Sequence, residues 1–548
     1  MINDFWEKVY LFCKKNLVIF ILLILAINVF MILNYIDKKD IYHPDEIWSY
    51  AHSNSSQGAF LAPNIDSFFV DYNNELHYKW FEQKQLKNYV SVQLDERFRY
   101  KHIWENLAKD VHPPLYYVIL HTISSFFVDG FSKWYAGVIN IVAFIVSFFV
   151  LFKIAKGIIK DEVIAFVGVS LWAFSYANMG IAMYLRMYML LLMFFSILMY
   201  ETLEFIKDKK GIRLFYIFVF SLLSFLVHYN AIISIFCLFF LTSAVFIYRK
   251  DFIILWQYCL VFLFACVALW VIVPSIENVL FLSQRGKEMA SIYGSVSKLI
   301  EKGKGVINFA YVWGGNLFSF NQYLGCGLFV IGIIVSVILC YKNKDKLRAD
   351  VFVLALWSIG IGIVLAILMP NMGSLNIRYY ALVMPFMMML TIFLIKSVWQ
   401  MLGLKKEILF FVLFGCFVFN SVFAKHCVGN GDFLFRSRNE DKSYWQKLEN
   451  KDAFLITRST VGPFFDALNY TMNSHRVMAV KYLCNEDMIN YAVNHNIKYV
   501  LVVNEIVFEN LDVMPRKYVE RCSFFEKNYA YQKTIRGGQT YFDFYELK

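Results

Sequence analysis

Apolar runs of about 20 residues recur along the chain, and short polar turns separate most of them. A helix of about 20 residues crosses the roughly 30 Å hydrocarbon core of a bilayer, so each run predicts one membrane-spanning helix. We expect about eleven such helices, at residues 16–36, 134–152, 163–183, 187–206, 214–229, 231–248, 252–274, 324–341, 351–370, 379–400 and 407–425.

Two long segments are more polar than the rest. Residues 37–133 predict a long loop that carries short helices beside the membrane. Residues 426–548 alternate short apolar runs, such as AFLIT and KYVLVV, with helix-like stretches, which is typical of a small α/β domain. The expected fold class is therefore an all-α polytopic membrane protein over 1–425, which includes the loop, followed by an α/β C-terminal domain over 426–548.

The distribution of charge predicts the orientation. The net charge of +11 could suggest a nucleic-acid partner, but the basic residues gather in short turns between apolar runs. These turns lie at 153–160, 207–213, 249–250, 342–348 and 405–406. Basic turns face the cytoplasm in membrane proteins. We therefore expect a plasma (inner) membrane protein with a cytoplasmic N-terminus, an extracytoplasmic loop and C-terminal domain, and no nucleic acid.

The segment Val111–Val128 is apolar but short, and two prolines follow its second residue. A full crossing there would invert the basic turns that follow, so we expect this segment to lie along the outer interface. Tyr116 and Tyr117 would then sit at headgroup depth. Asp110 precedes the prolines and is expected to cap the N-terminus of a helix that begins near Pro113.

Charged and titratable residues that are distant in sequence fall on the predicted outer side. They are Asp45, Glu46, Asp110, His112, Arg186, His228 and Arg378, with Tyr188 and Tyr379 beside the two arginines. Each also has a purely structural interpretation: the acids as solvated loop residues, the arginines as side chains reaching lipid phosphates, and the histidine as an interfacial residue. Their occurrence on one side favours a common site.

This set of side chains suits a reaction on a lipid phosphate. Guanidinium groups bind phosphate through paired hydrogen bonds. A nearby carboxylate can act as the general base for an attacking hydroxyl, or can bind a divalent cation such as Mg²⁺ or Mn²⁺ that bridges to the phosphate. No nucleotide-binding signature is present, neither G-x-x-x-x-G-K-[ST] nor G-x-G-x-x-G after a strand.

Four short motifs resemble a known family. They are "PDE" at 44–46, "DVHPPLYY" at 110–117, "RMY" at 186–188 and "RYY" at 378–380. Together they resemble the GT-C glycosyltransferases, and within these the branch that uses polyprenyl-phosphate sugars. That branch, related to glycosyltransferase family 39, includes protein O-mannosyltransferases, aminoarabinose transferases and lipopolysaccharide-core transferases.

The resemblance implies an inverting transfer of a sugar from a polyprenyl-phosphate carrier to a hydroxyl acceptor at the outer face of the membrane. The acceptor would be a cell-envelope glycan, a lipid or a protein. Asp45 would be the catalytic base, with Glu46 on acceptor or sugar hydroxyls. Asp110 and His112 would line the same site, and Arg186 and Arg378 would bind the leaving phosphate. Tyr188, His228 and Tyr379 would complete the substrate-binding set.

Two other functional classes stay open at this point. A transporter or lipid flippase would place polar residues near the bilayer midplane and would break its helices in paired halves. A structural membrane protein would use its loop and tail to bind a partner, and would tolerate loss of Asp45.

Overall fold

The computed structural model describes residues 2–39, 42–56, 79–108, 110, 112–273, 348–368, 377–430, 439–456, 467–468, 470–480, 486–506, 523–537 and 540–548. The chain forms two compact units. Met1–Ile36 and Ala136–Phe433 make up one, which we call the helical unit; Asp37–Tyr135 and Leu434–Lys548 make up the other, which we call the sheet-bearing unit.

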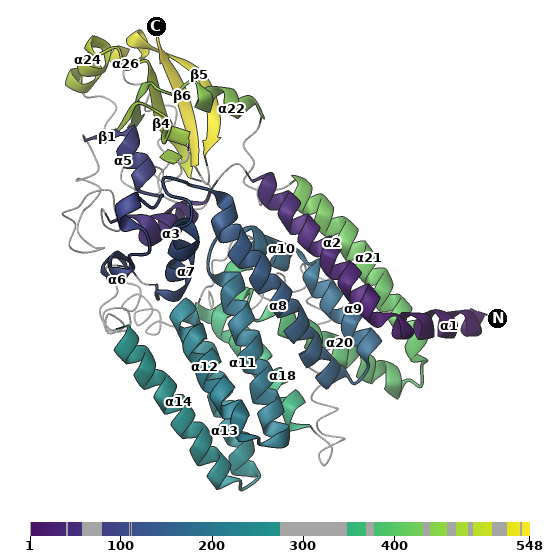
Figure 1. Ribbon diagram of the computed structural model, residues 1–548. Coiled ribbons are helices and arrows are strands. Elements are labelled where there is room, and N and C mark those ends of the chain that lie inside the picture. Colours follow the sequence, from purple (N-terminus) through teal and green to yellow (C-terminus); the bar gives the residue numbers. More distant parts are fainter. Residues whose placement is uncertain are drawn as a thin grey trace, which may run out of the picture. The chain divides into compact units, whose positions relative to one another are not determined.

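The helical unit is a bundle of long apolar helices (Figure 1). Its described helices are α1 (Ile2–Lys15), α2 (Leu17–Asp37), α8 (Lys133–Ile159), α9 (Glu162–Ala173), α10 (Tyr176–Met183), α11 (Tyr188–Asp208), α12 (Gly211–Val227), α13 (Asn230–Tyr248), α14 (Phe252–Ile272), α18 (Ala349–Leu368), α19 (Ile377–Tyr380), α20 (Met384–Met401) and α21 (Lys406–Asn430). Among the described residues, six helices are long and apolar enough to cross a membrane, or seven if α9 and α10 form one span. The chain is thus a multi-pass membrane protein.

The predicted spans coincide with these helices, with two qualifications. The span predicted at 324–341 lies outside the described residues, so the total of about eleven stays a prediction. The span predicted at 163–183 is two helices, α9 and α10, bent by 54°. At the bend, the Asn178 side chain donates to the carbonyl of Ala173 (2.7 Å), and the Ser175 hydroxyl accepts from the backbone N–H of Asn178 (3.3 Å). These side chains satisfy backbone groups that the break leaves without helical partners.

Cations from segments distant in sequence cap the C-terminal end of α8. The last carbonyls of a helix have no partner within the helix and carry partial negative charge. Arg348 donates to the carbonyls of Gly157 (2.7 Å) and Ile158 (3.1 Å), and Lys396 donates to that of Ile159 (2.5 Å). The basic end of α8 is therefore fixed to α20 and to the residue that precedes α18.

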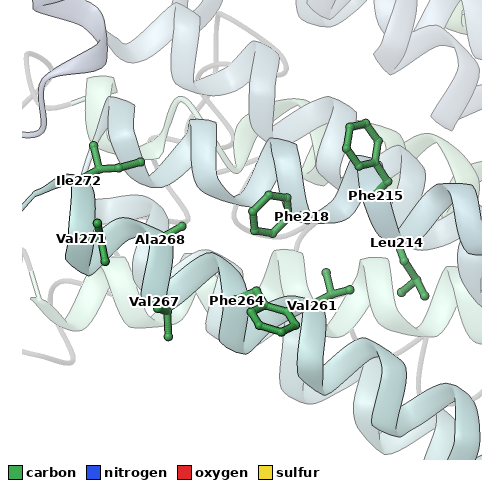
Figure 2. Close-up of a pocket in the computed structure, with 9 residues that line it drawn as sticks. All are labelled: Leu214, Phe215, Phe218, Val261, Phe264, Val267, Ala268, Val271 and Ile272. Atoms are coloured by element: carbon green, nitrogen blue, oxygen red, sulfur yellow. The ribbon is translucent and has the colours of Figure 1, made fainter.

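An apolar groove of about 610 Å³ runs between α12 and α14. Figure 2 shows its lining, which consists of Leu214, Phe215 and Phe218 from α12 and Val261, Phe264, Val267, Ala268, Val271 and Ile272 from α14. Most of these side chains are widely exposed, and Val271 is 70% exposed. Apolar surface on this scale would be unfavourable in water, whereas it is the expected surface of helices that face lipid tails.

The sheet-bearing unit combines a six-stranded sheet with short helices. The strands are β1 (Trp80–Glu82), β2 (Asp452–Ile456), β3 (Arg476–Val480), β4 (Tyr499–Ile506), β5 (Tyr529–Gly537) and β6 (Thr540–Leu547), in the order β1-β3-β2-β4-β6-β5. β2 is parallel to both β3 and β4, and the other pairs are antiparallel. A core that includes Phe454, Val480 and Val500 joins the sheet to α24 (Glu486–Asn494) and α26 (Ser523–Asn528); α22 (Asn439–Gln446) packs on β5.

This grouping differs from the predicted domain division. The sequence placed 37–133 with the membrane-spanning helices, but β1 from that loop forms an edge of the sheet and pairs antiparallel with β3, Phe81 opposite Val477. The loop also contributes α3 (Pro44–Asn54), α5 (Gln83–Asn88), the 3-10 turn η1 (Leu94–Glu96), α6 (Lys101–Leu107) and α7 (Leu115–Ser124). A three-residue strand carries too weak a pattern to be recognised in a polar loop.

Tyr116 and Tyr117 do not face lipid headgroups as predicted, whereas the depth of their segment at the outer interface stays a prediction. Both are fully buried in α7, which packs against α3. Asn54 at the end of α3 donates to the hydroxyl of Ser124 (3.3 Å) and to the carbonyl of Val90 (2.9 Å). The tyrosines therefore form the core of the loop helices, and bulky aromatic side chains are as suitable for that role as for a membrane interface.

Candidate active site

The first predicted acidic pair lies at the N-terminus of α3. Pro44 occupies the first turn, and His43 is the N-cap, its Nδ1 accepting from the backbone N–H of Asp45 (3.1 Å). Glu46 reaches back and accepts from the backbone N–H of His43 (2.7 Å). This reciprocal arrangement satisfies helix N–H groups that would otherwise be orphaned. It fixes the Glu46 carboxylate and places both acids in the first turn of the helix, where the helix dipole stabilises negative charge.

The two adjacent acids have different environments. Glu46 is fully buried and forms an ion pair with buried Lys39, Nζ to Oε2 3.0 Å. Burial lowers the pKa of Lys39, and the charge of Glu46 opposes that shift. Asp45 instead has a side chain that is 28% exposed, with its Oδ2 3.7 Å from Nδ1 of His43. The geometry gives Glu46 a structural role, and its direct role in catalysis stays a prediction.

The second predicted acid, Asp110, has a histidine on each side. Its Oδ2 lies 2.8 Å from Nδ1 of His112 and 3.3 Å from Nε2 of His52. A carboxylate only accepts hydrogen bonds, so Nδ1 of His112 carries the proton in that contact. The predicted capping role of Asp110 is wrong: α7 begins at Leu115, with Pro114 at its N-cap position.

His52 was missed in the sequence. It is buried in α3, two turns after Asp45, and its ring lies 6.2 Å from that of Trp48 and 5.8 Å from that of Tyr117. Residues seven apart share one face of a helix. The spacing from Asp45 to His52 was therefore the available signal, but it became meaningful only once Asp110 was found beside that face.

In the helical unit, the predicted Arg186 lies in the link between α10 and α11 and is 3% exposed. Asn140 of α8 fixes this link, because its side-chain amide donates to the carbonyls of Ala182 (3.1 Å) and Tyr184 (2.7 Å). The backbone N–H of Arg186 also contacts the Tyr184 carbonyl (2.7 Å). The sequence offered no reason to connect Asn140 with Arg186.

An aromatic row joins three of the other predicted residues. Arg378 of α19 donates to the hydroxyl of Tyr184 and lies 5.3 Å from the centre of its ring. The Tyr184 ring stacks on Tyr188 (5.8 Å), which in turn contacts His228 (5.3 Å). Tyr184 was not predicted, and its role as the link between Arg378 and Tyr188 depends on packing that the sequence does not reveal. The side chain of the predicted Tyr379 lies outside the described residues.

The predicted site residues thus form two groups. Asp45, Glu46, Asp110 and His112 belong to the sheet-bearing unit, and Arg186, Tyr188, His228 and Arg378 belong to the helical unit. That both groups act in one pocket stays a prediction. Within the described residues there is no cluster of three or more His, Cys, Asp or Glu side chains that could hold a metal ion, so we assign no residue to the divalent cation considered above.

Comparison with known proteins bears on the fold. No protein-family model and no curated protein sequence matches the chain. ArnT from Cupriavidus metallidurans in the apo state matches with a TM-score of 0.51 and 12% identity, over 97% of this chain and 98% of that one. The same ArnT bound to undecaprenyl phosphate gives a TM-score of 0.49 and 12% identity, over 96% of this chain and 98% of that one.

The archaeal oligosaccharyltransferase AglB from Archaeoglobus fulgidus, in complex with an inhibitory peptide and a dolichol-phosphate, gives a TM-score of 0.46 and 12% identity, over 90% of this chain and 70% of that one. At such low identity a likeness concerns the fold. The chain has the GT-C fold that its motifs led us to expect.

Proposed function

We propose that this protein is a membrane glycosyltransferase that moves a sugar from a polyprenyl-phosphate carrier to a hydroxyl acceptor, with inversion at the anomeric carbon. The observation that carries the proposal is the contrast between the neighbouring acids of α3. Glu46 is buried in an ion pair, whereas Asp45 keeps a partly exposed carboxylate beside its N-cap histidine. Adjacent carboxylates in unlike environments are a recurring sign of divided acid–base roles.

In the proposed reaction the oxygen of the acceptor hydroxyl attacks the anomeric carbon. Asp45 accepts the proton that this hydroxyl loses. The bond from that carbon to the phosphate oxygen breaks, and polyprenyl phosphate leaves with the electron pair. Proton removal by a positioned base accounts for about 10²–10⁴ in rate. Asp110, held between His52 and His112, is proposed to orient acceptor or sugar hydroxyls, for which a carboxylate of fixed position is well suited.

The arginines of the helical unit are proposed to bind the departing phosphate. Phosphate oxygens match the donors of a guanidinium in pairs, which makes arginine a suitable ligand for a phosphate. Arg186 is buried, and Arg378 is orientated by Tyr184. Charge that builds on the leaving oxygen would be stabilised electrostatically, as is usual for transfer reactions. Tyr188, Tyr379 and His228 are proposed to line the substrate.

We also propose that the donor and acceptor are used on the extracytoplasmic side of the plasma membrane, with the N-terminus in the cytoplasm. The basic turns support this orientation. Single cysteines test it. A cysteine at Leu94, which is 74% exposed in the sheet-bearing unit, should react with an impermeant thiol reagent on intact cells; one at Tyr248, 89% exposed at a basic turn, should react only after permeabilisation. The reverse pattern would overturn the orientation.

The activity is tested with purified protein in nanodiscs, supplied with a polyprenyl-phosphate sugar and candidate acceptors. Release of polyprenyl phosphate is the readout, and it separates a transferase from a transporter or flippase, which would move its substrate without cleaving it. Asp45→Asn should lower turnover by about 10²–10⁴. Arg378→Lys should raise the KM for the donor, because lysine cannot form the paired contact.

Asp129→Asn is the matched control for the base. Asp129 is exposed in the same unit, and its φ of 57° lies in the left-handed region, which asparagine tolerates well. This variant should keep wild-type turnover. If Asp45→Asn turned over normally while its thermal unfolding matched wild type, the assignment of the base would be wrong.

A further inference from the structure

The N-terminal helix α1 is amphipathic and does not take part in the proposed reaction. Phe5, Val9 and Phe12, spaced by four and three residues, share one face of the helix. Lys8 and Lys15 share another, and Lys14 stands on the far side. Such a helix, with an aromatic face flanked by Lys8 and Lys15 and opposed by Lys14, has the pattern of a segment that lies in the plane of a membrane surface.

Part of the apolar face of α1 anchors the helix to the bundle. Trp6 packs on Phe411 at the start of α21, ring centres 3.7 Å apart, and Tyr10 lies 6.0 Å from Phe410. The hydroxyl of Tyr10 donates to Asp161 at the N-cap of α9 (2.8 Å). The helix is therefore fixed in orientation against α9 and α21 and is not a free tail.

Three other apolar side chains of α1 are exposed. Phe5 is 57% exposed, Leu11 53% and Phe12 59%. The neighbouring turn between α20 and α21 has the same character, since Met401 and Leu402 are 57% and 66% exposed. In this turn Lys405 and Lys406 are also exposed, and Nζ of Lys406 lies 4.9 Å from the ring of Tyr10.

The position of α1 in the chain fixes the depth of this surface. α1 ends at Lys15 and α2, a membrane-spanning helix, begins at Leu17, so Asn16 is the single residue between them. Figure 1 shows α1 turned away from the direction of α2. A helix that leaves a span after one residue cannot be far from the boundary between lipid tails and headgroups.

We propose that α1 and the turn 401–406 form an in-plane binding surface for anionic phospholipids. The exposed aromatic and aliphatic side chains would enter the acyl region, and Lys8, Lys14, Lys15, Lys405 and Lys406 would bind phosphate headgroups. Among the described side chains of this surface the lysines outnumber the acids, which are Glu7 and Glu407. Attraction to an anionic leaflet amounts to about fivefold in affinity for each lysine near the surface.

The first test measures lipid preference with full-length protein in bilayers of phosphatidylcholine. Spin-labelled phosphatidylglycerol is the probe, and its association relative to labelled phosphatidylcholine is the readout. The variant K8Q/K14Q/K15Q should lose about tenfold or more of the wild-type preference at low salt, and the difference should shrink at 0.15 M salt, where the Debye length is about 8 Å. Glutamine keeps the helix propensity of lysine.

K84Q/K87Q/K101Q is the matched control, because it removes the same charge from exposed positions of the sheet-bearing unit. It should keep the wild-type preference. An unchanged preference in the α1 variant, or an equal loss in the control, would overturn the proposal.

The second test measures depth. A fluorescent amino acid at Phe12 should be quenched by lipids brominated near the headgroup more than by lipids brominated deep in the chain, and more strongly in anionic than in neutral nanodiscs. Absence of lipid quenching would mean that water or a second copy of the chain covers this face. Strongest quenching by the deep label would mean that α1 is part of a span. Either result refutes the surface.

Discussion

The buried histidine of α7, His121, should make the sheet-bearing unit sensitive to acid. Its side chain is fully buried, with its ring edge-on to His102 (5.0 Å) and Tyr100 (5.4 Å). Neither ring nitrogen has a hydrogen-bond partner in the part of the chain that the structure describes. Burial, with a smaller contribution from His102, lowers the pKa of His121 to about 4, although the backbone of Ser53 and of Glu96 opposes the shift.

The magnitude follows from linkage between protonation and folding. The unfolded chain has a histidine pKa near 6.5 and the folded state about 4, so between these values the unfolded state binds more protons. Protonation of His121 therefore costs no free energy of unfolding above about pH 6.5, and this free energy falls as the pH drops from 6.5 towards 4. At 1.36 kcal/mol per pKa unit the loss is about 3 kcal/mol. Solvent does not screen this charge, because the side chain is fully buried.

The variant His121→Phe removes the titrating group and keeps a planar ring of similar size. Hydrogen exchange of α7 amides, corrected for intrinsic rates, gives the opening free energy of this region from pH 4 to 7.5. We expect the wild type to lose about 3 kcal/mol more than the variant across this range. His495→Phe is the control, since His495 is exposed and lies on the face of Tyr491; it should keep the wild-type slope.

Equal slopes in wild type and His121→Phe would refute the reasoning. That result would mean that His121 is protonated in the folded state, or that a rearrangement at low pH gives it a partner. A steeper slope in the variant would show that His121 protects the fold against acid, which is the opposite sign.

Three more predictions concern contacts that hold each unit together. Lys39→Met leaves buried Glu46 without its ion-pair partner and should lower the free energy of unfolding by about 3–5 kcal/mol in thermal or denaturant unfolding. The double variant Lys39→Met/Glu46→Gln should recover part of this loss. A double variant no more stable than Lys39→Met would contradict the ion pair. Asn140→Ala leaves two buried carbonyls without their donor and should cost about 1–3 kcal/mol and raise the KM for the donor; an unchanged KM would separate Asn140 from Arg186. Trp80→Ala should cost about 3–5 kcal/mol and expose the segment around β1 to proteases, and resistance equal to wild type would contradict the pairing of β1 with the sheet.

The sequence predicted the helical part of the fold well because hydrophobic length is a local property. Each apolar run from α8 to α14 is helical near its expected bounds, the run at 163–183 as the two helices α9 and α10. The bend between α9 and α10 was missed even though Ser175 and Asn178, which stabilise it, are three residues apart in an otherwise apolar run. Serine is a common N-cap residue, but the hydrophobic residues on both sides of Ser175 concealed this helix start.

The candidate site was predictable only in part. Motif resemblance supplied Asp45, Asp110, His112, Arg186 and Arg378, and each is placed in a well-defined environment. Their partners could not be predicted, because each is brought near by packing between distant segments.

Lys39 shows why the partners of the site residues could not be predicted from the sequence. In the sequence it stands in "DKKD" directly after the first span, where a lysine normally faces water. In the structure it is buried against Glu46 and gives that acid a structural partner. A buried charge needs a specific opposite charge, and whether that partner is present depends on the tertiary fold.

The pairing of β1 changes how the C-terminal residues should be regarded. A three-residue strand is not stable alone, so β1 is ordered by its contacts: the pairing with β3, the Trp80 hydrogen bond to the hydroxyl of Tyr491 (3.3 Å) and the guanidinium of Arg476 over the Trp80 ring (4.6 Å). All of these partners come from the tail. The loop that carries Asp45 and Asp110 therefore shares its sheet with residues more than 300 positions later in the chain. The two segments form one compact unit, so the tail is not an independent docking module. Its removal would disturb the segment that bears the proposed base.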